Sequence, residues 1–178
     1  AAMITIRPAH TGDTIHLETL LAPHIDRGTI LPRQVDPGAF LLALEDGVLV
    51  GAVALTPQSA RVVELGTLVS NRPGIGLGQR LVNAAVARAV DAGYEVIMAL
   101  SALTRFFEKT GFVNAPHAPW ISARRDLSMA FPRPLNPDAD AIEAADAKAR
   151  TCRTCQRLTS CRQALLLRKL PVQHRKRA

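Results

Sequence analysis

The residues best suited to chemistry form a glycine-rich segment at residues 72–79. Gly74, Gly76 and Gly78 alternate with apolar residues between a predicted strand at 61–69 and a predicted helix at 79–92. Glycine lets the backbone approach a ligand closely, and the first turn of a helix carries N–H groups that attract anions. We therefore predict that the segment binds a phosphate-bearing ligand through Arg72, Pro73, Gly74, Ile75, Gly76, Leu77, Gly78 and Gln79.

The spacing of the glycines excludes two common phosphate-binding motifs. A dinucleotide-binding loop needs a third glycine three positions after the second, and that position holds Gln79. A P-loop ends in Gly-Lys followed by Ser or Thr, an ending that this segment lacks. A glycine-rich connection that binds nothing stays open as an explanation, because glycine is common in turns.

Hydrophobic periodicity and turn residues predict the elements that position this segment. A helix should begin after Asp13 and end at Pro23, with an apolar face made by Ile15, Leu17, Leu20 and Leu21. Strands are expected around 4–6, in a hairpin of 40–44 and 48–55, and at 61–69, 94–100 and from 112; further helices are expected at 79–92 and 103–110. This order predicts an α/β fold with a mixed sheet covered by helices.

Three segments, 64–70, 76–82 and 105–112, resemble successive motifs of the GNAT superfamily of N-acetyltransferases. The resemblance implies the GNAT fold, in which the fourth and fifth strands of a mixed sheet splay apart and helices cover both faces. It implies acetyl-CoA as co-substrate, with a main-chain N–H near Val69 polarising the thioester carbonyl. It also implies coenzyme contacts from Leu68, Val69, Ser70 and Phe107. The superfamily's Arg or Gln before the glycines falls on Pro73, with Arg72 beside it.

Acetyl transfer requires the amine to lose a proton and the coenzyme thiolate to gain one. Glu64 matches a glutamate that serves as the base in some GNAT relatives, and the alternative is an ordinary exposed strand carboxylate. Many relatives protonate the thiolate with a Tyr at the position where this chain has Phe107. The proton would then come from water or from the hydroxyl of Ser101 or Thr104, unless none is needed.

The acceptor is suggested by a narrower similarity. Residues 28–33 and 99–101, together with the Phe-Phe pair at 106–107, are similar to short, kinase-free bacterial N-acetylglutamate synthases. This similarity implies L-glutamate as the first candidate acceptor, and hence a role in arginine biosynthesis. Arg33 would bind the acceptor's carboxylate and Ser101 would also contact the acceptor, although a solvated loop arginine is equally consistent with the sequence.

The C-terminal segment differs in composition from the rest of the chain. Ten of the 22 Lys and Arg residues lie at 148–178, which contains no Asp or Glu, so the net charge of +7 originates there. We expect a GNAT domain at 3–131 and an extension at 132–178, with a proline-containing linker, an alanine-rich helix at 139–149 and a helical, cysteine-containing basic segment. Cys152, Cys155 and Cys161 are either half of a metal site or small apolar helix residues, and we assign no metal site.

Composition also limits the partners. No uncharged stretch of about 18 residues or more predicts a membrane span, and no secretory signal follows Met3, so we expect a cytoplasmic protein. The basic tail has no aromatic residue to stack on a base, so no specific nucleic-acid partner is expected. The expected partner is a small-molecule amine, and a homodimer is left open.

Three functions remain in competition. The first is an acetyl-CoA-dependent N-acetyltransferase acting on a small amino acid. The second is a GNAT enzyme acting on another amine, such as a protein lysine or N-terminus, a polyamine or an aminoacyl-tRNA. The third is a coenzyme-A-binding regulatory module with little turnover, which the absence of a Tyr at Phe107 makes plausible.

Overall fold

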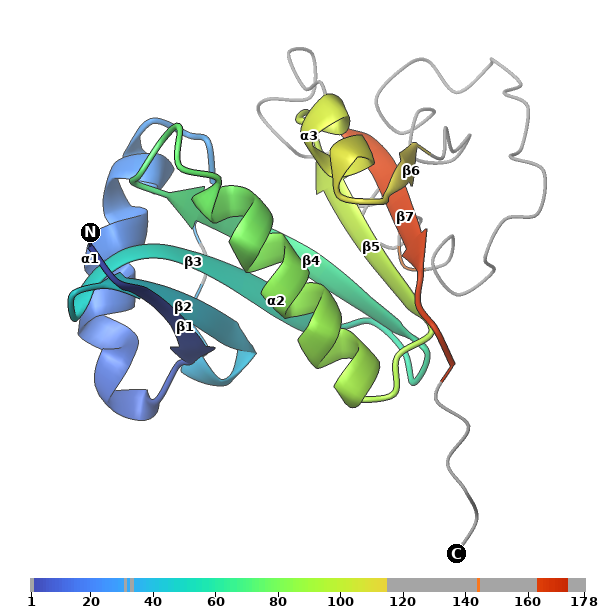
Figure 1. Cartoon of the computed structure of the whole chain (residues 1–178), viewed down its shortest axis with the longest axis horizontal. Coiled ribbons are helices and arrows are strands. Elements are labelled where there is room, and N and C mark those ends of the chain that lie inside the picture. Colours follow the sequence, from blue (N-terminus) through green and yellow to red (C-terminus); the bar gives the residue numbers. More distant parts are fainter. Residues whose placement is uncertain (1, 31, 33, 115–143, 145–162, 173–178) are drawn as a thin grey trace, which may run out of the picture. The chain divides into compact units, whose positions relative to one another are not determined.

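A mixed β-sheet organises the part of this computed structural model that is described, residues 2–30, 32, 34–114, 144 and 163–172. Within these residues seven strands follow the order β1-β2-β3-β4-β5-β7-β6 (Figure 1). The strands are β1 (Ile4–Pro8), β2 (Phe40–Glu45), β3 (Val48–Pro57), β4 (Val62–Ser70), β5 (Val96–Ser101), β6 (Val113–Asn114) and β7 (Ala164–Lys169). The helices are α1 (Thr14–Asp26), α2 (Leu77–Asp91) and α3 (Thr104–Lys109), with short 3-10 turns η1 (Thr11–Asp13) and η2 (Pro37–Ala39). The predicted α/β class is confirmed.

The chain divides into two compact units, which are described separately. The first unit contains residues 1–56 and 65–89, and the second contains residues 57–64 and 90–178. Strand β4 contributes to both, because its first three residues belong to the second unit and the remainder belongs to the first.

Strands β1, β2 and β3 of the first unit form an antiparallel arrangement. Strand β1 pairs with β2, and β2 pairs with β3 in a register that places Phe40 opposite Ala54 and Leu42 opposite Ala52. The β2–β3 turn contains Asp46 at φ +49° and Gly47 at φ +85°, which is the left-handed geometry that a tight hairpin requires. The predicted hairpin is confirmed.

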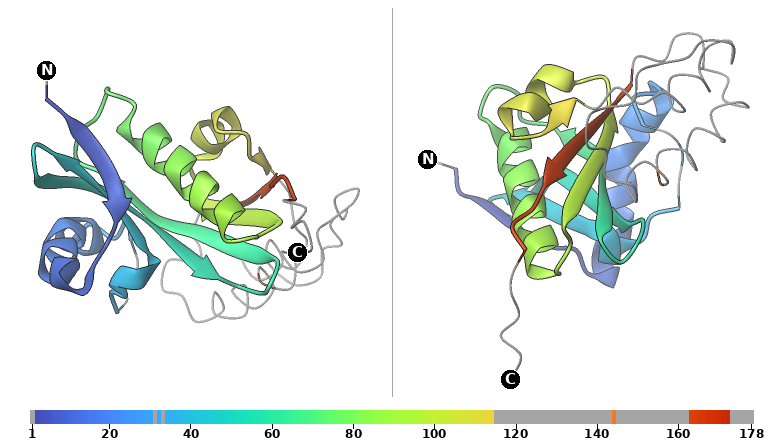
Figure 2. Two further views of the ribbon diagram at one scale, coloured as in Figure 1. Left: turned by 60° about the horizontal axis from the view of Figure 1, so that its bottom comes forward. Right: turned by 90° about the vertical axis from the view of Figure 1, so that its right-hand side faces the viewer.

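Helices α1 and α2 cover opposite faces of the first unit's strands (Figure 2). On one face the α1 leucines pack in a single cluster with strand residues, which comprises Leu17, Leu20, Leu21, Phe40, Leu42, Ala52, Ala54 and Val69. On the other face a Cβ added at Gly51 would lie 3.3 Å from Leu77 and 3.0 Å from Leu81 of α2. Glycine at this β3 position therefore lets α2 lie close against the strand.

The second unit combines parallel and antiparallel pairing. The parallel register of β4 with β5 covers three pairs, from Val62 opposite Val96 to Glu64 opposite Met98, although β4 continues to Ser70. Strand β5 pairs antiparallel with β7 along its whole length, and β6 pairs antiparallel with β7. A cluster of buried residues packs on this part of the sheet and comprises Val62, Val96, Met98, Ala144 and Leu165.

The structure corrects several details of the predicted elements. The extension was predicted to be helical, but Ala164–Lys169 forms strand β7, because β7 supplies an antiparallel partner for β5. Helix α2 starts at Leu77, two residues before its predicted start. Helix α1 continues past Pro23 to Asp26, since a proline removes only its own N–H and Arg27 still donates to the Pro23 carbonyl at 3.2 Å. Ile15 is 74% exposed rather than part of the apolar face.

Some predictions lie outside the described residues. These concern Arg33, the linker, the three cysteines, the basic tail and nearly all of the alanine-rich helix, of which only Ala144 is described. Ala144 is helical and buried.

Candidate functional site

The glycine-rich loop of the first unit begins where β4 ends. The main-chain N–H of Asn71 donates to the Val50 carbonyl of β3 at 2.8 Å. The next N–H, that of Arg72, donates to the Ser70 hydroxyl at 3.3 Å, and Pro73 has no N–H. Within the loop, main-chain donors for a ligand must therefore come from Gly74 onward.

Two glycines shape the exposed part of the loop. Gly74 has φ +81° and Gly76 has φ +71°, which are left-handed values that L side chains rarely adopt. A Cβ at either glycine would meet nothing within 4 Å, so the backbone angle rather than space requires glycine there. Between them Ile75 is 51% exposed, whereas Leu77 is buried and anchors the start of α2.

The N-terminus of α2 offers donors to an anion. Its first turn is closed by a hydrogen bond from the Arg80 N–H to the Gly76 carbonyl at 3.1 Å. The N–H groups that precede Arg80 in the helix have no intrahelical acceptor, and the helix dipole adds a partial positive charge at this end. The predicted contacts Leu77, Gly78 and Gln79 supply these groups, so the loop and the helix end together match the expected phosphate cradle.

Arg72 forms a salt bridge that the sequence did not predict. Its guanidinium forms a salt bridge with Glu45 at the end of β2, and its side chain is 50% exposed. The pair spans 27 residues of sequence, so spacing gave no indication of it. The predicted coenzyme contact from Arg72 stays a prediction, and in this structure the charge of its side chain is balanced by Glu45.

The end of β4 contains a backbone feature that sequence reasoning missed. Thr67 has φ +50° inside the strand, an unusual conformation for a β-branched residue, and strained backbone of this kind is enriched at functional sites. After this irregularity Val69 is buried in the α1 cluster. Asn71 donates toward β3, so the alternation of a strand directs the N–H groups of Leu68 and Ser70 away from β3.

Glu64 of the second unit is buried, with a relative exposure of 8%. Its carboxylate accepts a hydrogen bond from Gln58 Nε2 at 3.2 Å. The alternative of an ordinary exposed strand carboxylate is therefore wrong. A buried carboxylate needs hydrogen-bond partners, and one that can also take up a proton is suited to act as a base. The catalytic role of Glu64 stays a prediction.

The predicted hydroxyl and aromatic contacts lie around α3 in the second unit. Ser101 ends β5 and its Oγ accepts the N–H of Leu103 at 3.0 Å, so its own proton is left to donate elsewhere. Thr104 is the first residue of α3. Phe107 is 3% exposed, and its ring packs edge-on against Phe106 and Phe112. Core packing therefore explains Phe107, while its predicted contact with the coenzyme is untested.

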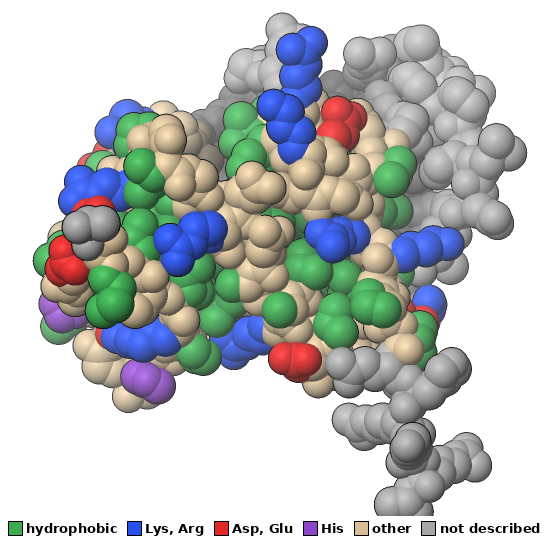
Figure 3. Space-filling model, in the orientation of Figure 1, with side chains coloured by type: hydrophobic (Ala, Val, Ile, Leu, Met, Phe, Trp, Pro, Cys, Tyr) green, Lys and Arg blue, Asp and Glu red, His purple; other side chains and the backbone are tan. Residues whose placement is uncertain are grey.

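Neither the charged side chains visible on one face nor the possible metal ligands among the described residues indicate a second site. The Lys and Arg side chains on the face in Figure 3 are spread over the surface rather than gathered in one patch. In the described residues no three His, Cys, Asp or Glu side chains come together in an arrangement that would hold a metal ion. None of the helices in this part of the chain combines the length and apolarity needed to cross a bilayer.

The family model of the acetyltransferase (GNAT) family matches residues 6–112. The chain belongs to this family. The match covers every glycine-loop residue and the predicted motifs at 64–70, 76–82 and 105–112, so the acyltransferase prediction is confirmed at the level of the family. A comparison with curated protein sequences finds no match.

Several solved structures share the fold. N-acetylglutamate synthase from Neisseria gonorrhoeae, complexed with coenzyme A and N-acetyl-glutamate, matches 96% of the chain at 24% identity and a TM-score of 0.67. The chain spans only 36% of that synthase. Rv2747 from Mycobacterium tuberculosis, in complex with CoA, matches 94% of the chain and is itself covered over 99% of its length, at 18% identity and a TM-score of 0.68.

A GNAT family acetyltransferase from Elizabethkingia anophelis with acetyl-CoA bound matches 94% of the chain and is covered over 98% of its own length. The identity is 16% and the TM-score 0.55. At identities this low the likeness concerns the fold.

Proposed function

We propose that this chain transfers the acetyl group of acetyl-CoA to the amino group of a small amino acid by direct attack in a ternary complex. The observation that carries the proposal is the cradle at the start of α2. Two left-handed glycines precede a helix N-terminus there, and the loop is exposed. Family membership selects coenzyme A among the phosphate-bearing ligands that such a cradle would accept.

The coenzyme would be bound largely by main-chain groups. The N–H groups from Gly74 to Gln79 would hold the diphosphate. The N–H groups of Leu68 and Ser70, directed away from β3, would pair with the amides of the pantetheine arm as a neighbouring strand does. The sequence prediction of a main-chain N–H near Val69 that polarises the thioester carbonyl stays a prediction. The N–H groups of Leu68 and Ser70 are the candidates for it, because the alternation of β4 directs the Val69 N–H toward β3.

An acceptor ammonium group loses two protons during the reaction, one before the attack and one as the amide forms, and the coenzyme thiolate gains one. Glu64, directly or through water, would take the first proton of the acceptor's ammonium group. The free amine then attacks the thioester carbonyl carbon, and the carbon–nitrogen bond forms. The nitrogen loses its second proton as the tetrahedral intermediate collapses and its carbon–sulfur bond breaks. Because Phe107 has no hydroxyl, Ser101, Thr104 or water would protonate the departing thiolate.

L-Glutamate is the first acceptor to test. The similarity of residues 28–33 to the short N-acetylglutamate synthases supports it, as does the fold likeness to a synthase complexed with N-acetyl-glutamate. Arg33 would bind the side-chain or α-carboxylate, because a guanidinium can donate two parallel hydrogen bonds to a carboxylate. Those synthases commonly carry an arginine where this chain has Gly66. Because one cationic partner for a dicarboxylate is missing, other amino acids are also candidate acceptors.

The test measures coenzyme binding and turnover separately. Calorimetry with CoA measures binding. Thiol release from acetyl-CoA is then measured with each member of a panel of amino acids, with a polyamine and with a lysine-containing peptide. Thiol release with glutamate alone supports the full proposal. Thiol release with another amine instead would identify that amine as the acceptor and contradict the assignment of glutamate. Binding without release would make the chain a coenzyme-binding module, and the absence of binding would overturn the proposal.

A further inference from the structure

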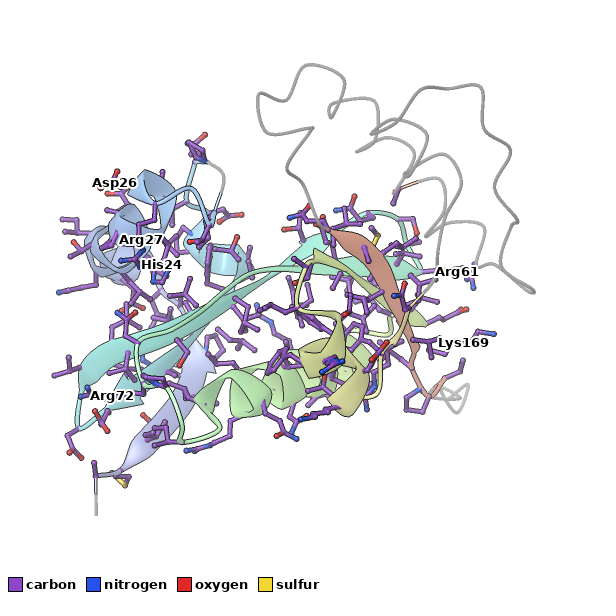
Figure 4. The ribbon with its side chains drawn as sticks, turned by 90° about the horizontal axis from the view of Figure 1, so that it is seen from above. His24, Asp26, Arg27, Arg61, Arg72 and Lys169 are labelled. Atoms are coloured by element: carbon purple, nitrogen blue, oxygen red, sulfur yellow. The ribbon has the colours of Figure 1, made fainter. Side chains whose placement is uncertain are left out.

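Three polar side chains form a hydrogen-bonded relay at the C-terminal end of α1. Arg27 Nη2 lies 3.4 Å from His24 Nδ1, and His24 Nε2 lies 3.3 Å from Asn71 Oδ1. Figure 4 places His24 and Arg27 side by side at this end of the helix. The relay therefore reaches from α1 to the residue that immediately follows β4.

The chemistry of the three groups fixes the direction of the relay. A guanidinium has only donors, so His24 Nδ1 must accept from Arg27. The proton of the neutral imidazole then resides on Nε2, which donates to Asn71 Oδ1. The Asn71 amide is thereby oriented with its oxygen toward His24, and its Nδ2, which carries two N–H donors, has no acceptor among the described residues.

Further hydrogen bonds hold the backbone at His24 and at Asn71. The His24 carbonyl accepts the Thr29 N–H at 2.9 Å, the Thr29 hydroxyl at 3.0 Å and the Ile30 N–H at 3.3 Å. The Asn71 N–H donates to the Val50 carbonyl of β3. The Asn71 amide is therefore preorganised, which reduces the entropy lost when it binds a ligand.

The main-chain donors of the neighbouring residues are already used, because the N–H groups of Asn71 and Arg72 are bonded and Pro73 has none. The Arg72 side chain is held on Glu45 through Nε and Nη2, and Glu45 balances its charge. Between Ser70 and Gly74, the oriented Asn71 side chain is therefore the neutral group among the described residues that has N–H donors left to offer. It lies directly beside the proposed diphosphate cradle in the sequence.

We infer that Asn71 binds the coenzyme, with its Nδ2 donating a hydrogen bond to a phosphate oxygen of acetyl-CoA, and that His24 is the residue that positions it. The inference rests on the proposed function, since it names a further contact within the same site. It assigns a ligand-binding role to a side chain outside the glycine motif, and it gives the α1 histidine a role in coenzyme affinity.

The first test is calorimetry with CoA on Asn71→Ala and on the near-isosteric Asn71→Asp. A hydrogen bond to a charged group is worth enough that Asn71→Ala should weaken binding about tenfold. Asn71→Asp should weaken it further, because it places a carboxylate beside the diphosphate. Asn83→Ala, an exposed asparagine on α2, is the matched control and should leave binding unchanged.

A second acetyl donor, acetyl-pantetheine, tests whether Asn71 contacts the phosphates of the coenzyme, because this donor lacks them. With this donor the kcat/KM of Asn71→Ala should equal that of the unaltered chain. An equal loss with acetyl-CoA and acetyl-pantetheine would show that Asn71 merely supports the strand, and it would overturn the inference.

A double-mutant cycle tests the part played by His24. His24→Ala should weaken CoA binding about threefold, and it should have no further effect when Asn71 is already alanine, because it acts through that side chain. His16→Ala, an exposed histidine on the same helix, should have no effect. Independent effects of His24 and Asn71 would contradict the positioning role.

Different results would contradict the proposed function and the inference about Asn71. If the unaltered chain binds no CoA, the proposed function falls and the inference falls with it. If the unaltered chain binds CoA and Asn71→Ala binds it equally well, only the inference falls.

Discussion

The glycine loop of the first unit and the predicted catalytic residues of the second unit are built in different ways. In the loop the useful groups are main-chain N–H donors, and their availability follows from two left-handed glycines and a helix N-terminus. In the second unit the useful groups are side chains, and Glu64, Ser101 and Phe107 each already have a partner within that unit. Under the proposed function, coenzyme binding would depend on local backbone geometry, whereas the chemistry would depend on side chains held by their surroundings.

The largest expected effect lies on the chemical side of this comparison. Glu64→Gln keeps an oxygen that can accept the hydrogen bond from Gln58 but removes the base. We expect kcat to fall about 10²- to 10⁴-fold while calorimetry shows unchanged affinity for CoA. A drop of less than about threefold, with lower thermal stability instead, would make Glu64 a structural carboxylate. Glu108→Gln on the exposed surface of α3 is the control.

The second prediction concerns the support beneath the loop. A Cβ at Gly51 would lie 2.9 Å from the Val69 carbonyl oxygen and 3.0 Å from Leu81. Main-chain atoms cannot yield as a flexible side chain can, so Gly51→Ala should destabilise the fold by about 1–3 kcal/mol and shift α2 outward. Denaturant unfolding measures the loss. Gly12→Ala, where a Cβ would meet nothing within 4 Å, should be nearly neutral, and equal costs at the two glycines would contradict the packing argument.

The third prediction separates backbone strain from coenzyme binding. Gly76 and Gly93 have φ values of +71° and +86°, and a Cβ at either would meet nothing within 4 Å. Alanine at each position should therefore cost about 1–2 kcal/mol of stability through strain alone. Only Gly76→Ala should also weaken CoA binding, by about tenfold. If Gly93→Ala weakens it as much, the loop has no special role in the binding of the coenzyme.

The sequence predicted the position of the loop between a strand and a helix, because the cause is local, while its binding of a coenzyme stays a prediction. Glycine spacing between a strand and a helix marks the cradle without knowledge of distant residues. The partners of the site residues were not predictable in the same way. Arg72 and Glu45 are 27 residues apart and His24 and Asn71 are 47 apart, so only the folded sheet and helices bring each pair together.

Two further misses have specific physical causes. Thr67 at φ +50° gave no signal, since a β-branched residue in a strand pattern predicts extended backbone. Strand β7 was missed because its leucine run, Leu165 to Leu167, has no alternation and suits a helix or a buried strand equally well. Its pairing with β5 across more than sixty residues of sequence decides the outcome.

The smallest expected effect is a pH dependence of the stability of the first unit. It should not alter the rate of acetyl transfer by residues of the second unit. Arg7 donates to both carboxylate oxygens of Asp13, at 2.8 and 2.9 Å, and the His10 N–H donates to one of them at 2.7 Å. These bonds hold the pKa of Asp13 well below its usual range, the side-chain bond with Arg7 being the largest cause. A lowered folded-state pKa stabilises the fold above the unfolded-state value near 4, and this contribution disappears as the pH falls from about 5 toward the folded-state value.

Unfolding curves of the unaltered chain and of Asp13→Asn should therefore differ most at neutral pH and converge in acid. Asp26→Asn, an exposed carboxylate at the end of α1, is the matched control and should follow the unaltered chain throughout. A constant difference between Asp13→Asn and the unaltered chain from pH 7 to pH 3 would show that the ion pair contributes through packing rather than through charge. Because Asp13 precedes α1, whose other end holds His24, CoA binding measured along the same titration would show whether loosening the start of this helix reaches the coenzyme site.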